Sequence, residues 1–566
     1  MKISLLILFL FFAVSLQAQE YPKDYFKSPL AIPLHLSATF GELRTNHFHS
    51  GLDFKTNYQT GLPVFAAAEG FVSRIKISVF GYGKAIYITH PNGFTTVYGH
   101  LERASSEIEA LIKKEQYKEK SYEVELFLGP KKLPLKAQDL IGFSGNTGGS
   151  GGPHLHFEFR DTASEEIINP FLFGFDQWIS DTKKPVVSSL LVYPISEDAV
   201  VNKTKKPVIV GFKSQKDGSL LASLIHAKGI IGFGVATFDE TDKNNNKNGV
   251  YKISLSQNEK TIYHVQFDRF SFNESRSVNV FVDFERLYKT IQKYQKLFKT
   301  HQVAIPVVAN ERSNGLIEMI PNFSQHFKMI VTDFHGNETV LHIPVKFSPD
   351  EAIDALEMIE KLFAVQNKKE HIYAQNGFEI VFPENAFYED CKLKIVTSDT
   401  LLQLHEPTIP VQNSIAISKE IPESQMPFYD KLYLAREVKS DIRYIKNYRK
   451  NQKLTIYTKD LGNYLVAIDT IVPAIKPINF KEGQWLSAVK SLQFEIEDKE
   501  SGIQTYNGFL NEQWVLFEYD YKTKTITHDF DNKFVLEGKN NLKIVVVDQL
   551  ENSTTFETHF FRSQKP

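Results

Sequence analysis

Two histidines one residue apart follow a glycine-rich stretch in "SGNTGGSGGPHLHFEFR", residues 144–160. Apolar and polar residues alternate over residues 153–160, which predicts a β-strand. Because side chains alternate between the two faces of a strand, His154, His156 and Glu158 share one face. Such a face can present two imidazoles to a metal ion or a substrate. It can equally be an ordinary polar face whose histidines are satisfied by hydrogen bonds.

A second cluster, "NHFHSGLDF" at residues 46–54, adds candidate metal ligands. His49 and Asp53 are four residues apart, but Gly51 between them disfavours a helix and indicates extended chain. A catalytic zinc takes three protein ligands from imidazole nitrogens and carboxylate oxygens and leaves one position for water. His49, Asp53 and one histidine of the later pair would complete that set. His47 shares a strand face with His49, and we place it outside the site.

A third cluster, "KAIYITHPNGFTTVYGHL" at residues 84–101, predicts a β-hairpin with the Asn-Gly pair as its turn. With a two-residue turn, His90 and His100 lie on opposite faces of the sheet, so only one can serve the same site. His100 then shares its face with Tyr98 and Thr96, a polar set suited to a cleft. For His90 we expect a structural role.

Together these stretches resemble the lysostaphin-like, LytM-type family of zinc metallopeptidases, which cut the peptide part of peptidoglycan. The resemblance runs over residues 36–171 and includes "FGELRTNHFHSGLDF", "IGFSGNTGGSGGPHLHFEFR" and "INPFLF". It implies a compact antiparallel β-sheet with Zn²⁺ in a surface groove. By this resemblance the zinc ligands are His49, Asp53 and His156, and the catalytic histidines that do not bind the metal are His100 and His154.

The resemblance implies an exported zinc metalloendopeptidase that hydrolyses peptide cross-links of peptidoglycan through a zinc-activated water. Histidine suits the proton transfers because its ordinary pKa lies near neutrality. The sequence does not divide the roles between His100 and His154. The alternative is a non-catalytic LytM-fold scaffold or activator that binds another cell-wall hydrolase. All five site residues are present, which favours the enzyme.

The N-terminus predicts export. Residues 1–18 combine Lys2, an apolar run and a small residue at Ala18, the pattern of a signal peptide. No later segment offers the roughly 20 apolar residues of a membrane helix, so we expect no transmembrane anchor and a periplasmic or extracellular location. The single cysteine, Cys391, excludes an internal disulfide. A net charge of −2 without a long basic block argues against a nucleic-acid partner.

Beyond the first domain the sequence predicts further β-structure, so that the fold class is mainly β. We expect a peptidase domain at 19–180, an Ig-like β-sandwich at 181–347, a helix plus a β-rich domain at 348–468, and a C-terminal Ig-like β-sandwich at 469–566. "DTKKPVV" recurs as "DTIVPAI", and "VTDFHGN" as "VVDQLEN", which indicates two copies of one module. The sandwiches are candidate surfaces for a cell-wall or protein partner.

Four segments within these predicted domains have features that indicate a particular structure or role. Residues 284–302 read as a helical insertion and 350–363 as an amphipathic helix. The polar tract at 242–249 reads as a solvated turn rather than a calcium loop, because Lys247 stands where such a loop needs glycine. Residues 102–134 look like an insertion containing an exposed helix. We consider two roles for it, a lid over the groove and a solvated surface excursion.

Overall fold

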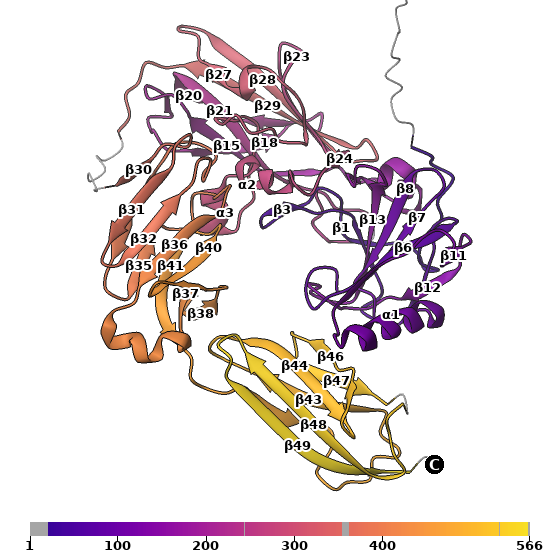
Figure 1. Ribbon diagram of the computed structural model, residues 1–566. Helices are drawn as coiled ribbons and strands as arrows, with labels where there is room; N and C mark the ends of the chain where they lie inside the picture. The colour runs from indigo at the N-terminus through magenta and orange to yellow at the C-terminus, as the bar shows by residue number, and fades with distance from the viewer. Residues whose placement is uncertain (1–20, 243, 354–361, 531–532, 564–566) are drawn as a thin grey trace, which may run out of the picture.

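The computed structural model describes residues 21–242, 244–353, 362–530 and 533–563, and these are mainly strands (Figure 1). The predicted mainly β fold class is therefore confirmed. The predicted signal peptide at 1–18 lies outside the described residues. Within the described ranges, no helix has the length and apolar character that crossing a membrane requires.

An antiparallel sheet forms the N-terminal part of the chain, with strand order β1-β4-β13-β8-β7-β6-β10. The alternation predicted for the "HLHFEFR" strand is confirmed, since Leu155, Phe157 and Phe159 are fully buried in the core. The strands are β1 (Leu36–Ala38), β4 (Leu52–Lys55), β6 (Gly70–Ile77), β7 (Lys84–Thr89), β8 (Phe94–Gly99), β10 (Val124–Phe127) and β13 (His154–Asp161). Strand β13 lies between β4 and β8 and so brings the three clusters together.

The β7–β8 hairpin forms, but its register differs by one residue from the expected one. Thr89 pairs with Thr95, and His90 is hydrogen-bonded to Phe94 across the turn. The turn therefore holds three residues rather than two. The shift moves His90 to the face of Thr96, to which it is hydrogen-bonded over 2.8 Å, because a shift of one residue exchanges the faces of a sheet.

Residues 181–347 form two sheets around one core, which we call the first module. One sheet has the order β17-β15-β21-β25, with β15 at Val186–Pro194, β17 at Val208–Val210, β21 at Ile230–Phe238 and β25 at Gln295–Lys296. The other contains β22 (Lys252–Gln257), β23 (Lys260–Gln266), β28 (Ser324–Thr332) and β29 (Glu338–Phe347). Strand β24 (Arg269–Phe270) instead pairs with β14 (Ile167–Ile168) and extends the peptidase sheet.

The helical insertion predicted at 284–302 is wrong in its length. Helix α3 covers only Phe284–Thr290 and ends at Ile291, which adopts a left-handed conformation. A shorter helix, α2 (Val278–Phe281), precedes it. Downstream, β25 pairs with β21, and Leu297 is buried in the core. Tertiary pairing therefore overrides the local helical pattern.

The polar tract at 242–249 is not a solvated turn. Asn244 and Asn248 are buried, and Lys55 donates a hydrogen bond of 2.8 Å to Asn244 Oδ1. Asn246 accepts a second hydrogen bond from the Lys55 Nζ, at 2.7 Å. The tract therefore packs against strands of the peptidase sheet, where asparagine side chains replace water as partners of the polar groups.

Two further units complete the chain. The third unit has two sheets around its own core, with the orders β31-β32-β36-β40-β39 and β34-β35-β41-β37-β38. These strands are β31 (His371–Gln375), β32 (Phe378–Phe382), β34 (Ile395–Thr397), β35 (Leu401–Leu404), β36 (Ile415–Glu420), β37 (Leu432–Val438), β38 (Asp441–Tyr444), β39 (Tyr448–Lys450), β40 (Lys453–Thr458) and β41 (Gly462–Ile468). The C-terminal unit, which we call the second module, has the sheets β42-β43-β47-β46 and β45-β44-β48-β49. These strands are β42 (Ala474–Pro477), β43 (Ser491–Glu497), β44 (Ile503–Leu510), β45 (Gln513–Val515), β46 (Glu518–Asp520), β47 (Thr525–Asp529), β48 (Gly538–Asp548) and β49 (Ser553–Arg562). The helix predicted at 350–363 falls mostly on residues outside the described ranges. The Ig-like assignment of the two modules and the domain boundaries stay predictions.

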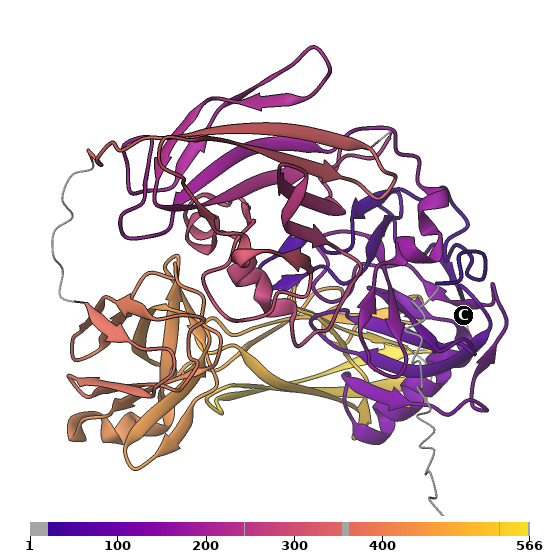
Figure 2. The same cartoon turned by 90° about the horizontal axis from the view of Figure 1, so that it is seen from above.

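The second module returns to the peptidase sheet, so the chain closes on itself (Figures 1 and 2). Lys84 forms a 2.7 Å ion pair with Glu518, and Lys522 donates a hydrogen bond of 2.9 Å to the Ser150 carbonyl. The ring of Tyr117, on helix α1 (Ser106–Glu119), packs edge-on against Trp514. Residues at the two ends of the described chain therefore share one interface.

Candidate active site

Three side chains from two strands and one loop converge on a single point. The ligand-type atoms of His49, Asp53 and His156 lie within 4.8 Å of one another. His49 Nε2 is 3.2 Å from Asp53 Oδ1, and His156 Nδ1 is 2.8 Å from the same oxygen. His156 and Asp53 are opposite each other in the β13–β4 register. The three residues predicted as zinc ligands are therefore brought together.

The outer nitrogen of each histidine is already engaged, which fixes the nitrogen that faces the centre. His49 Nδ1 donates to the Thr39 carbonyl over 2.7 Å, and His156 Nε2 donates to Glu158 Oε1 over 2.8 Å. A ring nitrogen that donates outward leaves the other nitrogen with a free lone pair toward the centre. Two imidazole lone pairs and a carboxylate oxygen form the donor set of a catalytic zinc site.

The charges around the centre favour a cation. Burial acts to raise the pKa of Asp53, but His49 and the hydrogen bonds with His154 and His156 hold it well below its ordinary value. Burial acts to lower the pKa of His156, yet Asp53 and Glu158 raise it to about 9. The imidazole of His156 therefore binds a proton tightly. A metal ion would compete with that proton for the lone pair that faces the centre.

The two other predicted catalytic histidines border this centre. His154 Nε2 lies 3.4 Å from Asp53 Oδ1, while its Nδ1 is 2.8 Å from the Gly152 carbonyl oxygen. The ring of His100 is 4.8 Å from that of His154, and its Nδ1 is 2.8 Å from the Thr147 carbonyl oxygen. In both rings Nδ1 faces a carbonyl, so Nε2 is the nitrogen left to exchange a proton.

His100 reaches the centre by a route that the sequence did not predict. Tyr98 lies in the core, on the opposite face from His156. His100 immediately follows β8 and has a φ of 60°, a left-handed conformation. This turn directs its ring toward His154 and His156 rather than to the face of Tyr98. Burial, with the nearby His156 and His154, lowers the pKa of His100 to about 3.

Glu158 is a site residue to which the sequence analysis assigned no role. Its side chain is fully buried and accepts hydrogen bonds from His156 and from Ser50, the latter at 2.6 Å. Tyr82 also donates to it, and Arg160 contacts its other oxygen at 2.7 Å. The sequence did contain an indication of this role, because strand alternation places Glu158 on the same face as the two histidines.

A pocket of about 660 Å³ surrounds the centre. Its walls include the site residues, the glycine-rich loop around Ser150, and Phe272, Ser275 and Arg276 of the first module. None of the residues that line it belongs to 102–134. That segment contains α1 and β10, and β10 pairs with β6 at the far edge of the sheet. The hypothesis of a lid over the groove is therefore wrong for this structure.

The remaining histidines of the three clusters lie outside the candidate metal centre. His90 is buried beside Phe26, with ring nitrogens 2.7 Å from the Glu69 carbonyl oxygen and 2.8 Å from Thr96 Oγ1. These contacts agree with the structural role expected for it. His47 is exposed at the pocket rim, and its Nδ1 is 2.9 Å from the Thr45 carbonyl oxygen.

Residues 47–117 match the model of peptidase family M23. The predicted resemblance to LytM-type peptidases is thereby confirmed. This stretch contains His49, Asp53 and His100, and the fold adds the later pair through β13. A second family model, that of the Zu5-like domain, matches residues 363–469.

Curated relatives match about a quarter of this chain. An uncharacterized metalloprotease of Haemophilus influenzae is 30% identical over 160 residues, which are 27% of this chain and 28% of the relative. The DD-carboxypeptidase/endopeptidase Mpg of Neisseria meningitidis is 35% identical over 23% of each chain. The peptidoglycan DD-endopeptidase ShyC of Vibrio cholerae is 29% identical over 24% of this chain and 27% of its own. The chain thus spans about a quarter of the length of these relatives.

Proposed function

We propose that the protein is an exported zinc metalloendopeptidase that hydrolyses peptide cross-links of peptidoglycan. The observation that carries this proposal is the convergence of His49 Nε2, Asp53 Oδ1 and His156 Nδ1, with both outer ring nitrogens engaged. Relatives described as DD-endopeptidases support the choice of substrate. The signal-peptide pattern at residues 1–18 supports export to the periplasm or beyond.

In the proposed reaction, the protein side chains position a water molecule and the scissile peptide bond. A zinc ion held by His49, Asp53 and His156 would supply Lewis-acid polarisation of the carbonyl and a lowered pKa of the water. His154 accepts the water proton at Nε2 and returns it to the departing amine. The carboxylate of Asp53, 3.4 Å away, stabilises the imidazolium that forms in between.

His100 is the second group that faces the reacting atoms in this scheme. The carbonyl of Thr147 fixes its ring, so its Nε2 can accept a hydrogen bond from the attacking water. An imidazole kept neutral by burial orients water without competing for the proton. We therefore assign proton transfer to His154 and water orientation to His100.

The substrate assay uses the purified mature protein and defined cross-linked muropeptides. Incubation with zinc should yield the uncrosslinked products, identified by mass, and a zinc chelator should abolish them until zinc is restored. The alternative, a non-catalytic activator of another hydrolase, predicts no product from the zinc-loaded protein alone. It predicts instead that a second hydrolase cleaves the muropeptides faster in the presence of this protein than alone.

Export has its own measurement. The mature protein should be recovered outside the cytoplasm, and its N-terminal sequence should begin at Gln19, directly after the predicted cleavage site at Ala18. Full-length protein confined to the cytoplasm would contradict this part of the proposal while leaving the peptidase assay unaffected.

A further inference from the structure

Three aspartates meet at one end of the first module, away from the peptidase centre. Carboxylate oxygens of Asp181, Asp239 and Asp333 lie within 4.8 Å of one another. Asp239 directly follows β21, and Asp333 directly follows β28. Only 2% of the Asp181 side chain is exposed, and Asp239 and Asp333 are 4% and 2% exposed. Three carboxylates are thus removed from water at one point.

One oxygen of this cluster has no partner. Asp239 Oδ1 is buried and accepts no hydrogen bond from any residue that the structure describes. The imidazole of His335 borders the cluster, with its Nδ1 3.9 Å from Asp181 Oδ2. Burial, reinforced by Asp181 and Asp333, raises the pKa of Asp239 to about 8. A buried carboxylate is costly unless a positive group or a metal ion compensates it.

The second module repeats this arrangement at the same positions of its strands. Val186 of β15 pairs with Phe238 of β21, and Ala474 of β42 (Ala474–Pro477) pairs with Glu497 of β43 (Ser491–Glu497). In each module one aspartate precedes the first strand by five residues, a second directly follows the partner strand, and a third stands at the turn before the last strand. In the second module these are Asp469, Asp498 and Asp548.

The hydrogen bonds that hold the third aspartate are also the same. Asn337 donates to Asp333 from its main chain at 2.9 Å and from its side chain at 2.7 Å. Asn552 donates to Asp548 in the same two ways, at 2.8 Å and 2.7 Å. Each asparagine amide also donates over 3.2 Å to the main-chain carbonyl of the first aspartate of its cluster. Two separate segments of the chain therefore hold an aspartate in the same hydrogen-bonding geometry, although the second cluster is completed by Glu500 rather than by Asp548.

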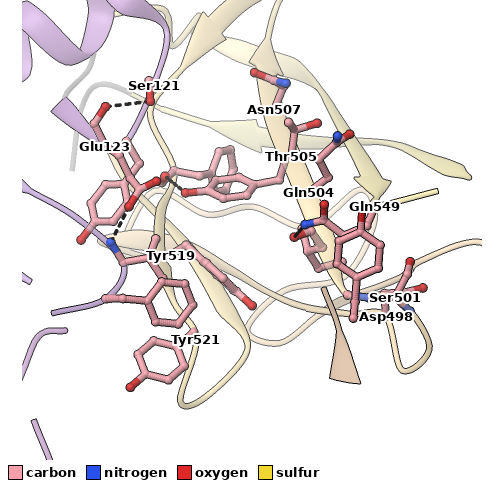
Figure 3. A pocket seen from close by; sticks show the side chains of 18 of the residues that line it. Ser121, Glu123, Asp498, Ser501, Gln504, Thr505, Asn507, Tyr519, Tyr521 and Gln549 are labelled. Carbon is pink, nitrogen blue, oxygen red and sulfur yellow. Dashed lines mark hydrogen bonds between the residues drawn. The ribbon is translucent and has the colours of Figure 1, made fainter. Parts of the chain in front are cut away.

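The second cluster shares the unpartnered oxygen as well. Asp498 Oδ1 accepts hydrogen bonds from the main chain of Ser501 and Gly502, whereas Asp498 Oδ2 is buried and has no partner among the described residues. Oxygens of Asp469, Asp498 and Glu500 lie within 4.8 Å of one another. Figure 3 shows Asp498 and Ser501 at the end of a pocket of about 780 Å³, away from Ser121 and Glu123.

We infer that each module binds one calcium ion at its carboxylate cluster, which is formed by Asp181, Asp239 and Asp333 in the first module and by Asp469, Asp498 and Glu500 in the second. The ligand atoms are oxygens alone, without sulfur, which selects a hard divalent cation. Calcium binds carboxylate and carbonyl oxygens at about 2.3–2.6 Å, so two ligands on opposite sides of the ion stand about 4.6–5.2 Å apart. The oxygens of each cluster, which lie within 4.8 Å of one another, fit this separation. The unpartnered oxygens of Asp239 and Asp498 are the ligands that the protein leaves unsatisfied.

Both sites lie where a module meets the preceding part of the chain. Beside the first, His335 Nε2 is 3.3 Å from the Asp176 carbonyl oxygen of the peptidase region. Beside the second, Lys431 of the third unit donates to the Leu550 carbonyl over 2.7 Å, and Tyr433 donates to the Glu500 carbonyl over 3.0 Å. Calcium at these points fixes both junctions, so its removal should loosen the closed arrangement of the four units.

The test measures calcium binding to the mature, zinc-loaded full chain. Protein freed of calcium on a chelating resin and resupplied with zinc is dialysed to equilibrium against labelled calcium. We expect two calcium ions per chain. Asp239→Asn and Asp498→Asn should each lose one, and the double variant both. The control Asp217→Asn changes an exposed aspartate in a turn of the first module, where its carboxylate accepts only local hydrogen bonds, and should keep two.

Thermal unfolding provides a second readout that separates lost ligation from misfolding. Calcium should raise the melting temperature of the wild type, by less in each single variant, and not at all in the double variant. Without calcium, each variant should melt at or above the wild type, because one of three neighbouring carboxylates is gone. Magnesium in place of calcium should give a smaller rise.

Three results would overturn the inference. The first is a folded wild type that binds no calcium. The second is retention of both ions by Asp239→Asn or Asp498→Asn. The third is a variant that loses calcium yet melts well below the wild type in calcium-free buffer, which would make the aspartate a structural hydrogen-bonding group. None of these outcomes depends on peptidase activity.

Discussion

His156 Nε2 donates a 2.8 Å hydrogen bond to Glu158 Oε1, two residues further along the same strand. This contact directs His156 Nδ1 toward Asp53 and His49. Arg160, two residues beyond, binds the other oxygen of Glu158. One face of a single strand therefore supplies a proposed metal ligand, the carboxylate that orients it, and the cation that keeps this carboxylate ionised.

The first prediction concerns the metal ligands. His49→Ala and Asp53→Ala should each lose bound zinc and peptidase activity together, because two remaining ligands hold the ion poorly. Zinc content by atomic emission and product formation from muropeptides measure both effects. His47→Ala is the matched control, since its exposed ring lines the same pocket and contacts the Thr45 carbonyl. Full zinc occupancy in either ligand variant would remove that residue from the set.

The second prediction separates proton transfer from metal binding. His154→Ala and His100→Ala should keep zinc and lose turnover by about 10²–10⁴-fold, the usual effect of removing a positioned acid or base. Zinc content and kcat are measured on the same preparations. The ligand assignment is wrong if either variant purifies without metal while His156→Ala retains it.

The third prediction concerns Glu158. Glu158→Gln should still accept the hydrogen bond from His156 but without the negative charge, so zinc affinity should fall by about 10–100-fold. Competition with a chromogenic chelator measures this affinity. Glu165→Gln is the control, because Glu165 also contacts Arg160, at 3.2 Å, but its side chain is 65% exposed. Equal affinity of the two variants would show that Glu158 only balances the charge of Arg160.

The fourth prediction concerns the contact between the second module and the glycine-rich loop. Lys522 donates to the Ser150 carbonyl, and Ser150 Oγ is 3.1 Å from His154 Nδ1. Lys522→Ala should free this loop and lower kcat/KM severalfold, with zinc content unchanged. Lys524→Ala, which removes only an ion pair to Glu497 from the same turn, should retain full activity. An unchanged rate in Lys522→Ala would limit the contact to holding the two units together.

The sequence by itself determined the β13 strand and nominated the five residues that the structure brings together. Alternation of apolar and polar residues fixes which side chains of a strand share a face, so the positions of His154, His156 and Glu158 followed directly. The spacing of His49 and Asp53 around a glycine likewise indicated a non-helical ligand pair. The extended conformation of both segments followed because each prediction depends on neighbours within a few residues.

Features that depend on contacts between residues far apart in sequence were decided only by the tertiary structure. His100 reaches the site through a left-handed backbone conformation just after its strand, which period-two reasoning does not anticipate. Residues 291–302 leave the helical pattern because β25 pairs with β21, some 60 positions earlier in the chain. Lys522 meets the loop at Ser150 only because the chain closes on itself. Contacts between residues far apart in sequence leave no local pattern, so only the folded chain reveals them.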